Sequence, residues 1–465
     1  MTPVGSTAAF HGEEPRAEVE RLALFVHRAA WGNLSLAARE ALKVRVLDSV
    51  GCAYGALGGD PVRILRREVD EFGGAPFCAL VGGGRTSPDR AALYNGALVR
   101  YLDFNDSYLA KGETCHPSDN LGAVLAASEY AGSSGKDLLV ALAVAYQVQC
   151  RLSDAAPLRA RGFDHVTQGA IAAAAGAAKA LRLDPHRIAN AVAIAGTANN
   201  ALRVTRTGEL SHWKGLAAPN AAFNGLRAAF LAMRGITGPG EMFEGTKGWK
   251  QVVSGPFDVD WEAEDLERVR RTILKKYNSE IHSQSAVEGI LGLMREGGFR
   301  AEEIDRIRID IFDVAHRIIG GGDEGDKTVV RSKEDADHSL PYIVAVAALD
   351  GEVTPAQYAP GRIAREDVQR LLLRVDVAPD PSLSGRFPGE LPCRLTVGLA
   401  DGRVVTKEIP GYEGFHTQPM SWGRAVEKFR TLAAPVRNRD RLGVVVQAVS
   451  GLESITTREL TACLS

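Results

Sequence analysis

The chain has 465 residues, of which 45% are hydrophobic and 24% are charged. This length exceeds what one ordinary hydrophobic core can organise, so it predicts two or more domains. The 55 basic residues nearly balance the 57 acidic residues, and this balance argues against nucleic acid as a partner.

The cysteines and the N-terminus bear on the cellular compartment. The six cysteines are scattered and form no Cys-x-x-Cys pair, which favours reduced thiols and a cytoplasmic protein. The first 20 residues lack the basic and apolar segments of a targeting signal, so we expect a flexible tail over residues 1–20. The longest apolar run, from Leu138, is shorter than the roughly 20 residues that a membrane span needs. We therefore expect no membrane partner.

Helix signals dominate the first part of the chain. Residues 36–57 favour a helix that ends at a Gly-Gly-Asp-Pro sequence, where glycine and proline both oppose continuation. Asp48 lies inside this helix and is interpreted as structural. A shorter helix and a short strand-like segment follow. Ser87 and Pro88 then begin a helix that we expect to reach Leu102.

Residues 101–120, YLDFNDSYLAKGETCHPSDN, concentrate polar side chains between two apolar helices. A polar loop of this length is uncommon unless it is functional; the alternative is a solvated connection whose Asp and Ser residues cap helices. Cys115 beside His116 invites interpretation as a nucleophile or a metal ligand, but neighbours in sequence usually point apart. The polar side chains are Asp103, Asp106, Ser107, Glu113, His116 and Asp119.

Alanine-rich helices follow the loop and predict an irregular helical bundle. Two polar segments interrupt it. In the first, Asp164 and His165 precede a helix; a single histidine there is most often a capping group. In the second, Lys214 lies beside Trp213 and Leu216. A lysine is ordinarily solvated, but apolar neighbours would partly desolvate this ammonium and lower its pKa.

The pattern changes beyond residue 275. Ile307, Ile309 and Ile311 alternate as in a half-buried strand, residues 371–377 predict a second strand, and residues 393–409 predict a hairpin that turns at Asp401 and Gly402. The last part of the chain favours helices again. A smaller α+β region therefore follows the helical one.

LDFNDS at residues 102–107 and HPSDN at residues 116–120 resemble the MmgE/PrpD family. Further segments resemble the family in the same order: LDSVGCAYGALGG, GFDH, the segment around Lys214, ILKKYNSEIH and EDADHSLPY. The resemblance implies a mainly α fold with a large all-α helical domain and a smaller α+β lid domain. We expect the tail at 1–20, the helical domain at 21–272, the lid domain at 273–410 and a return to the helical domain at 411–465.

The resemblance also implies site residues. The chain departs from the family by having Asp164 where His is usual, and Ala217 and Pro219 where His and Gly are usual. Lys276 is an alternative to Lys275, and helix capping is an alternative role for the residues at 338–342. The implied catalytic residues are Asp103, His116, His165, Lys214 and Lys275, and the implied substrate-binding residues are Ser107, Tyr277, His282, His338, Ser339 and Tyr342.

The resemblance implies a lyase that acts on small polycarboxylates without a cofactor, most simply by removing water as a 2-methylcitrate dehydratase of propionate metabolism does. The lysines would stabilise an enediolate, His165 or Asp103 would be the base, and His116 the acid. The alternatives are decarboxylation of a cis-aconitate-like acid, isomerisation or epimerisation of a dicarboxylate, and a non-catalytic carboxylate-binding or scaffold protein. We expect no metal, because no clustered ligands occur, and a homodimer, because the alanine-rich helices outnumber what one small bundle covers and relatives dimerise.

Overall fold

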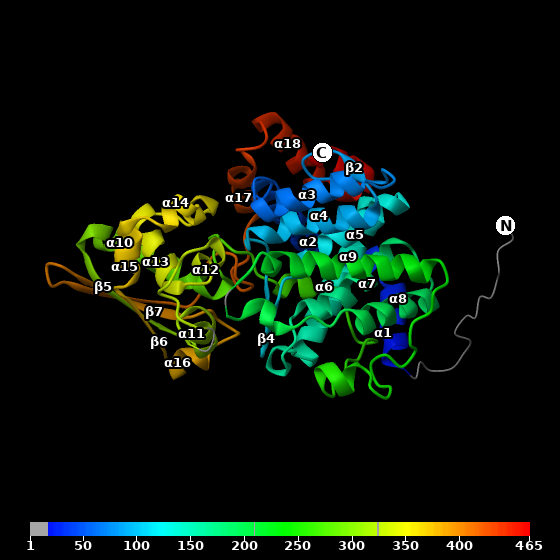
Figure 1. The fold of residues 1–465 in the computed structure, drawn as a ribbon, viewed down its shortest axis with the longest axis horizontal. Helices are drawn as coiled ribbons and strands as arrows, with labels where there is room; N and C mark the ends of the chain where they lie inside the picture. Colours follow the sequence, from blue (N-terminus) through cyan, green and yellow to red (C-terminus); the bar gives the residue numbers. More distant parts are fainter. Residues whose placement is uncertain (1–16, 209, 323–324) are drawn as a thin grey trace.

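A computed structural model describes residues 17–208, 210–322 and 325–465 and is mainly helical, with small β-sheets (Figure 1). Helix α1 (Glu18–Arg28) begins inside the predicted tail. Glu18 is buried and accepts hydrogen bonds from Trp261 and Lys250. The tail prediction is therefore wrong for residues 18–20, and residues 1–16 lie outside the described residues.

The first hydrophobic core joins α1 to the long helices between residues 36 and 233, drawn from blue to green in Figure 1. Small residues let these helices approach closely. A Cβ atom at Gly225 would lie 2.6 Å from the carbonyl oxygen of Ala170, so the contact between α7 and α9 requires glycine there. The helices are α2 (Leu36–Gly55), α3 (Asp60–Phe72), α4 (Pro88–Tyr101), α5 (Leu121–Ala131), α6 (Gly135–Ala155), α7 (Val166–Ala180), α8 (Pro185–Ala198) and α9 (Trp213–Met233).

The segment 101–120 is more ordered than the predicted loop. Strands β3 (Tyr108–Ala110) and β4 (Glu113–Cys115) form an antiparallel hairpin, and Pro117–Asn120 forms a 3-10 helix. Three of its carboxylates support the fold. Asp106 accepts hydrogen bonds from Tyr146 and the Ser118 amide, Glu113 from the amides of residues 158 and 159, and Asp119 from Asn105.

The second hydrophobic core lies around a four-stranded sheet in the order β6-β5-β7-β8. β5 and β6 are parallel and the other pairs are antiparallel. The isoleucine strand and the hairpin are confirmed, but helix α15 (Glu366–Leu372) occupies the start of the second predicted strand. The strands are β5 (Ile304–Ile311), β6 (Val375–Pro379), β7 (Cys393–Leu399) and β8 (Val404–Ile409); the main helices are α10 (Gln284–Gly297), α11 (Asp313–Ile319), α12 (Lys333–Ala336) and α13 (Leu340–Asp350).

The C-terminal helices return to the first core. Helix α17 packs along α2, and its Phe429 is buried there (Figure 1). This return agrees with the sequence-based expectation, whereas the domain boundaries stay predictions. The C-terminal helices are α17 (Trp422–Ala433), α18 (Arg439–Ser450) and α19 (Thr457–Leu464).

Two further expectations concern the membrane and the oligomeric state. Within the described ranges, no helix combines the length and apolar character that a bilayer crossing demands. The homodimer stays a prediction.

Lys428 on α17 anchors the returning helix to three other segments. Its ammonium lies 2.6 Å from the carboxylate of Asp48 on α2 and donates hydrogen bonds to the carbonyl oxygens of Phe104 and Lys275. Burial raises the pKa of Asp48, and Lys428 opposes that shift. Asp48 therefore has a structural role, because it holds the Lys428 ammonium, which in turn binds the backbone at Phe104 and Lys275.

We expect Lys428→Met to reduce the free energy of unfolding by about 3 kcal/mol, because it leaves a buried carboxylate without its partner. Chemical denaturation measures this. Lys407→Met is the control: its partner Glu296 is exposed, so its loss costs less than about 1 kcal/mol. Adding Asp48→Leu to Lys428→Met should recover part of the stability; equal losses in both lysine variants would contradict the anchoring role.

Candidate active site

The two cores meet around a polar cavity of about 50 Å³. All five predicted catalytic residues line it. Among the described lining residues, six are arginine or lysine and two are aspartate or glutamate. The lining is Arg100, Asp103, Thr114, His116, Arg159, His165, Arg203, Arg206, Leu210, Lys214, Lys275, Glu280, Ile318 and His338.

Asp103 follows the end of α4 in a left-handed backbone conformation, with φ of +53°. Its carboxylate lies 2.5 Å from Arg100 and 2.8 Å from Lys275. The Lys275 ammonium also donates to the Asp103 carbonyl oxygen at 2.6 Å, which helps to hold this uncommon conformation. Burial alone would raise the pKa of Asp103, but Arg100, Lys275 and Lys214 outweigh it and hold the pKa well below its usual range. Asp103 is therefore an ionised and weakly basic carboxylate.

His116 follows the β3–β4 hairpin. Its Nδ1 lies 2.7 Å from the carbonyl oxygen of Asp106 and 3.1 Å from the hydroxyl of Ser107. Because a carbonyl oxygen only accepts, Nδ1 carries the proton and Nε2 is the unprotonated nitrogen of the neutral ring. Burial and Arg100 lower the pKa of His116 well below 6.5. Cys115 does not line the cavity and packs beside Cys150 instead.

His165 lies at the start of α7, and its ring centroid is 5.4 Å from that of His116. The Nδ1 atom is 2.8 Å from the carboxylate of Asp164, which also accepts a hydrogen bond from Arg206. The buried Nε2 atom has no hydrogen-bond partner within the described part of the chain. Burial lowers the pKa of His165, although Asp164 opposes the shift. The ring therefore presents a free lone pair in a cavity it lines.

Lys214 projects from the first turn of α9. Its ammonium lies 3.0 Å from Asp337, 2.9 Å from Nδ1 of His338 and 3.9 Å from Asp103. Burial lowers the pKa of Lys214, with Asp337 and Asp103 opposing. Asp103, Asp337 and His338 also have the mutual spacing of a metal site, with ligand atoms within 4.8 Å of one another. The lysine ammonium is within hydrogen-bond distance of two of these groups.

Of the two neighbouring lysines, the structure places Lys275 and not Lys276 in the cavity lining. Lys275 is 1% exposed and lines the cavity. Lys276 instead pairs with Glu288 at 2.7 Å, and that glutamate also accepts a hydrogen bond from the hydroxyl of Tyr277. Lys276 and Tyr277 are therefore directed away from the cavity.

Of the six predicted substrate-binding residues, the structure places His338 alone in the cavity lining. Ser107 supports His116, and His282 bonds to Glu280, which does line the cavity. Ser339 caps α13, and the hydroxyl of Tyr342 donates to the carbonyl oxygen of Gln357 inside the second core. The capping alternative is correct for Ser339 because its side chain accepts from the Tyr342 amide.

Sequence reasoning missed Arg100, Arg206, Glu280 and Asp337. Arg100 lies on the helix that leads into the site segment, and Asp337 directly precedes His338. A charged residue in the last turn of an apolar helix was the signal for Arg100. A nearby histidine was the signal for Asp337, beside His338, and for Glu280, two residues before His282, whereas Arg206 had no such signal.

Comparison with known proteins connects this geometry to a family. Residues 20–262 match the MmgE/PrpD N-terminal domain, and residues 277–450 match the MmgE/PrpD C-terminal domain. The chain belongs to the MmgE/PrpD family.

Individual MmgE/PrpD relatives carry two different names. The chain is 31% identical to 2-methylcitrate dehydratase of Cupriavidus necator over 415 residues, covering 83% of this chain and 84% of the relative. It is 28% identical to 2-methylcitrate dehydratase of Escherichia coli (strain K12) over 455 residues, covering 89% and 90%. It is 26% identical to cis-aconitate decarboxylase of Mus musculus over 469 residues, covering 95% and 91%. MmgE/PrpD membership therefore leaves the reaction open between elimination of water and loss of carbon dioxide.

We expect His116 to be less than half protonated at pH 6.5, because burial and Arg100 lower its pKa. Nitrogen-15 NMR of the imidazole rings measures this, and His116→Gln assigns the signal. The reference is the same ring in urea-unfolded protein, which should titrate near its ordinary value of about 6.5. Half-titration at or above pH 6.5 in the folded protein would contradict the assigned electrostatics.

Proposed function

We propose that this MmgE/PrpD protein removes water from a small tricarboxylate of the 2-methylcitrate type. The observation that carries the proposal is a basic cavity into which one histidine presents an unpartnered nitrogen. Six arginine and lysine side chains line that cavity, and Nε2 of His165 has no hydrogen-bond partner among the described residues. Such a cavity supplies both charge for several carboxylates and a base.

The cations would bind and activate the substrate. Removing a proton beside a carboxylate produces an enediolate, and fixed positive charges stabilise it where the charge develops. Lys214 is held by Asp337, and Lys275 is held by Asp103. Because these contacts fix the ammonium groups before substrate arrives, little reorganisation accompanies the reaction.

His165 is the better of the two expected bases. The Asp103 carboxylate contacts Arg100 and Lys275, which makes it a weak acceptor. In His165, Asp164 holds the proton on Nδ1 and leaves Nε2 able to accept one from the substrate. We therefore assign proton abstraction to His165 and charge organisation to Asp103.

The leaving hydroxyl requires a proton donor. We retain His116 for this role, although burial and then Arg100 lower the pKa of its ring. A bound polyanion would offset the cations of the cavity and raise the pKa of His116, so that substrate binding itself could charge the ring. Lys214 is the second donor, because its ammonium lies in the same cavity.

Substrate entry requires the two cores to separate. The cavity of about 50 Å³ is far smaller than the roughly 300 Å³ or more of common small-molecule pockets. Its lining comes from both cores, with Lys214 on one side and His338 on the other. We infer that opening between them admits the substrate and that closure excludes water.

The alternatives use the same cavity. A decarboxylase would stabilise the same kind of carbanion with the same cations, and an isomerase would return the proton to another position or face. A non-catalytic carboxylate-binding protein would need the cations but not the buried, unpartnered Nε2 atom of His165. The homodimer remains part of the proposal, and no observation on the cavity depends on it.

The function is tested by incubating the chelator-treated protein with 2-methylcitrate, citrate, cis-aconitate and an aspartate-derived dicarboxylate. We expect loss of water from 2-methylcitrate or citrate without added metal, because Lys214 occupies the position between Asp103, Asp337 and His338. Carbon dioxide release would favour the decarboxylase. Binding without turnover of any acid would favour the non-catalytic alternative, and recovery only with a divalent ion would refute the metal-free mechanism.

We expect Lys214→Met to lower kcat/KM on the best substrate by about two to three orders of magnitude, since one fixed charge contact contributes roughly 3 to 4 kcal/mol. Lys214→Arg should restore little, because a planar guanidinium does not replace a compact ammonium. Steady-state kinetics measures both. Lys276→Met is the control, because its ammonium pairs with Glu288 away from the cavity. Near-full activity in Lys214→Met would remove Lys214 from the mechanism.

His165→Gln should abolish exchange of the substrate proton with D₂O and slow turnover by about 10² to 10⁴, the usual contribution of a general base. Mass spectrometry of recovered substrate measures the exchange. His116→Gln should slow turnover yet keep exchange, because it affects the later protonation. His186→Gln on the exposed surface of α8 is the control. Exchange that persists in His165→Gln would assign the base to another residue.

A further inference from the structure

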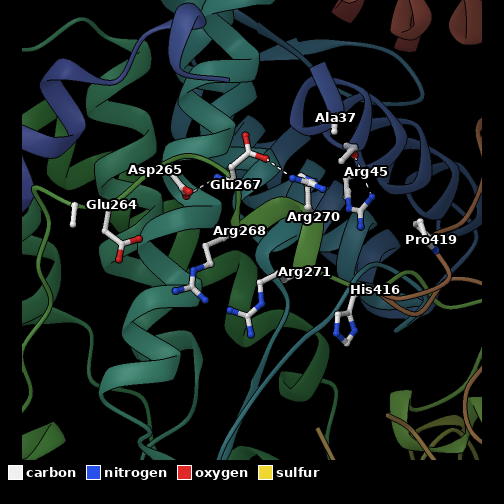
Figure 2. A pocket seen from close by; sticks show the side chains of 12 residues that line it. Ala37, Arg45, Glu264, Asp265, Glu267, Arg268, Arg270, Arg271, His416 and Pro419 are labelled. Carbon is white, nitrogen blue, oxygen red and sulfur yellow. Dashed lines mark hydrogen bonds and ion pairs between the residues drawn. The ribbon is translucent and has the colours of Figure 1, made fainter. Parts of the chain in front are cut away.

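A second cavity lies on the helical core and shares no lining residue with the candidate active site. It has a volume of about 760 Å³ and opens to solvent. Its walls come from α2, from residues 263–271 and from the segment that leads to α17 (Figure 2). The second half of the 263–271 segment is the 3-10 helix η6 (Arg268–Arg271).

Most acidic groups around this cavity already have basic partners. Glu264 is paired with Arg151, and Glu267 is paired with Arg270 and accepts hydrogen bonds from Ser35. Arg268 is in turn paired with Asp154. The two charges within each pair cancel, so these pairs contribute little net charge to the cavity.

Three basic groups that line the cavity form no ion pair with an acidic residue in the described part of the chain. Arg271 is exposed and has no hydrogen bond or ion pair within the described residues, and the same holds for the half-buried ring of His416. Arg45 is buried and donates to Thr272 and the carbonyl oxygen of Ala41, and within residues 17–208, 210–322 and 325–465 it forms no ion pair with a carboxylate. Burial and then the charge of Arg271 lower the pKa of His416.

The three groups lie together. In Figure 2, Arg271 lies between Arg268 and His416, with Arg45 above His416, whereas Glu264 and Asp265 lie on the opposite side. The cavity therefore has one wall with uncompensated positive charge. Cation-lined concavities concentrate anions, and a guanidinium binds phosphate or carboxylate oxygens through two parallel hydrogen bonds.

We propose that this cavity is a second ligand site, which binds a compact anion with two or more negative charges on phosphate or carboxylate groups. Arg271 and His416 contact the anion, and the buried guanidinium of Arg45 in the cavity lining supplies further positive charge. An anion bound there stabilises the imidazolium of His416, so ligand binding and protonation of that ring favour each other.

The site is tested with inorganic pyrophosphate and, separately, with citrate, each at constant ionic strength. Calorimetry measures binding, and NMR titration follows the His416 ring, whose signal is assigned with His416→Gln. Citrate also suits the candidate active site, so calorimetry alone would not tell the two cavities apart. The His416 signal is therefore needed, because this ring lies in the second cavity. We expect at least one anion to raise the pKa of His416. A response to pyrophosphate identifies phosphate chemistry, and a response to citrate identifies carboxylate chemistry.

Matched variants separate a built site from diffuse surface charge. Arg271→Gln should weaken the binding seen at His416 by about tenfold or more, because it removes a charge-assisted contact. Arg227→Gln, which removes an exposed arginine from α9 outside this cavity, should leave binding unchanged. The proposal is overturned if neither anion moves the His416 signal, or if both variants weaken binding equally.

Discussion

The buried carboxylate of Asp103 is the group on which the rest of the candidate active site depends. It contacts Arg100 from the last turn of the preceding helix α4 and Lys275 from the segment entering the second core, and Lys214 and His338 lie within 4 Å. Withdrawing a carboxylate from water costs several kcal/mol unless oppositely charged groups surround it. Arg100 and Lys214 come from the helical core, whereas Lys275 and His338 come from the segment that enters the second core and from that core, so the full set of charges around Asp103 assembles where the two cores meet.

The excess of basic side chains also determines which histidines can accept or donate protons. Burial and neighbouring cations keep His116 neutral, and burial does the same for His165 against the opposing charge of Asp164. A polyanion entering the cavity would offset the positive charges around His116 and raise the pKa of its ring. In the proposed mechanism, substrate binding and proton transfer would thus be coupled through electrostatics.

The two cavities contrast in how their cations are satisfied. In the candidate active site, carboxylates such as Asp337 and Asp164 hold the lysine and arginine side chains in place. In the open cavity, Arg271 and His416 lack such partners within the described residues. The first arrangement suits catalysis, because fixed charges need no reorganisation, whereas the second suits reversible capture of an anion from solvent. The chain between them is short, since Arg271 is followed within four residues by Lys275.

The amino-acid sequence by itself determined the helical character, the isoleucine strand, the hairpin at Asp401 and Gly402, and, through resemblance to a family, five residues that now line one cavity. It did not predict the hairpin of β3 and β4, whose three-residue strands are too short for a periodic signal. Tertiary structure decided that Tyr277, Ser339 and Tyr342 do not line the cavity and that Arg100, Glu280 and Asp337 belong to the charged cluster around it. The reason is separation along the chain: Lys214 meets Asp337 across 123 residues, and Lys275 meets Asp103 across 172. Local periodicity reflects neighbours in sequence, whereas the partner of a buried charge depends on how distant helices dock.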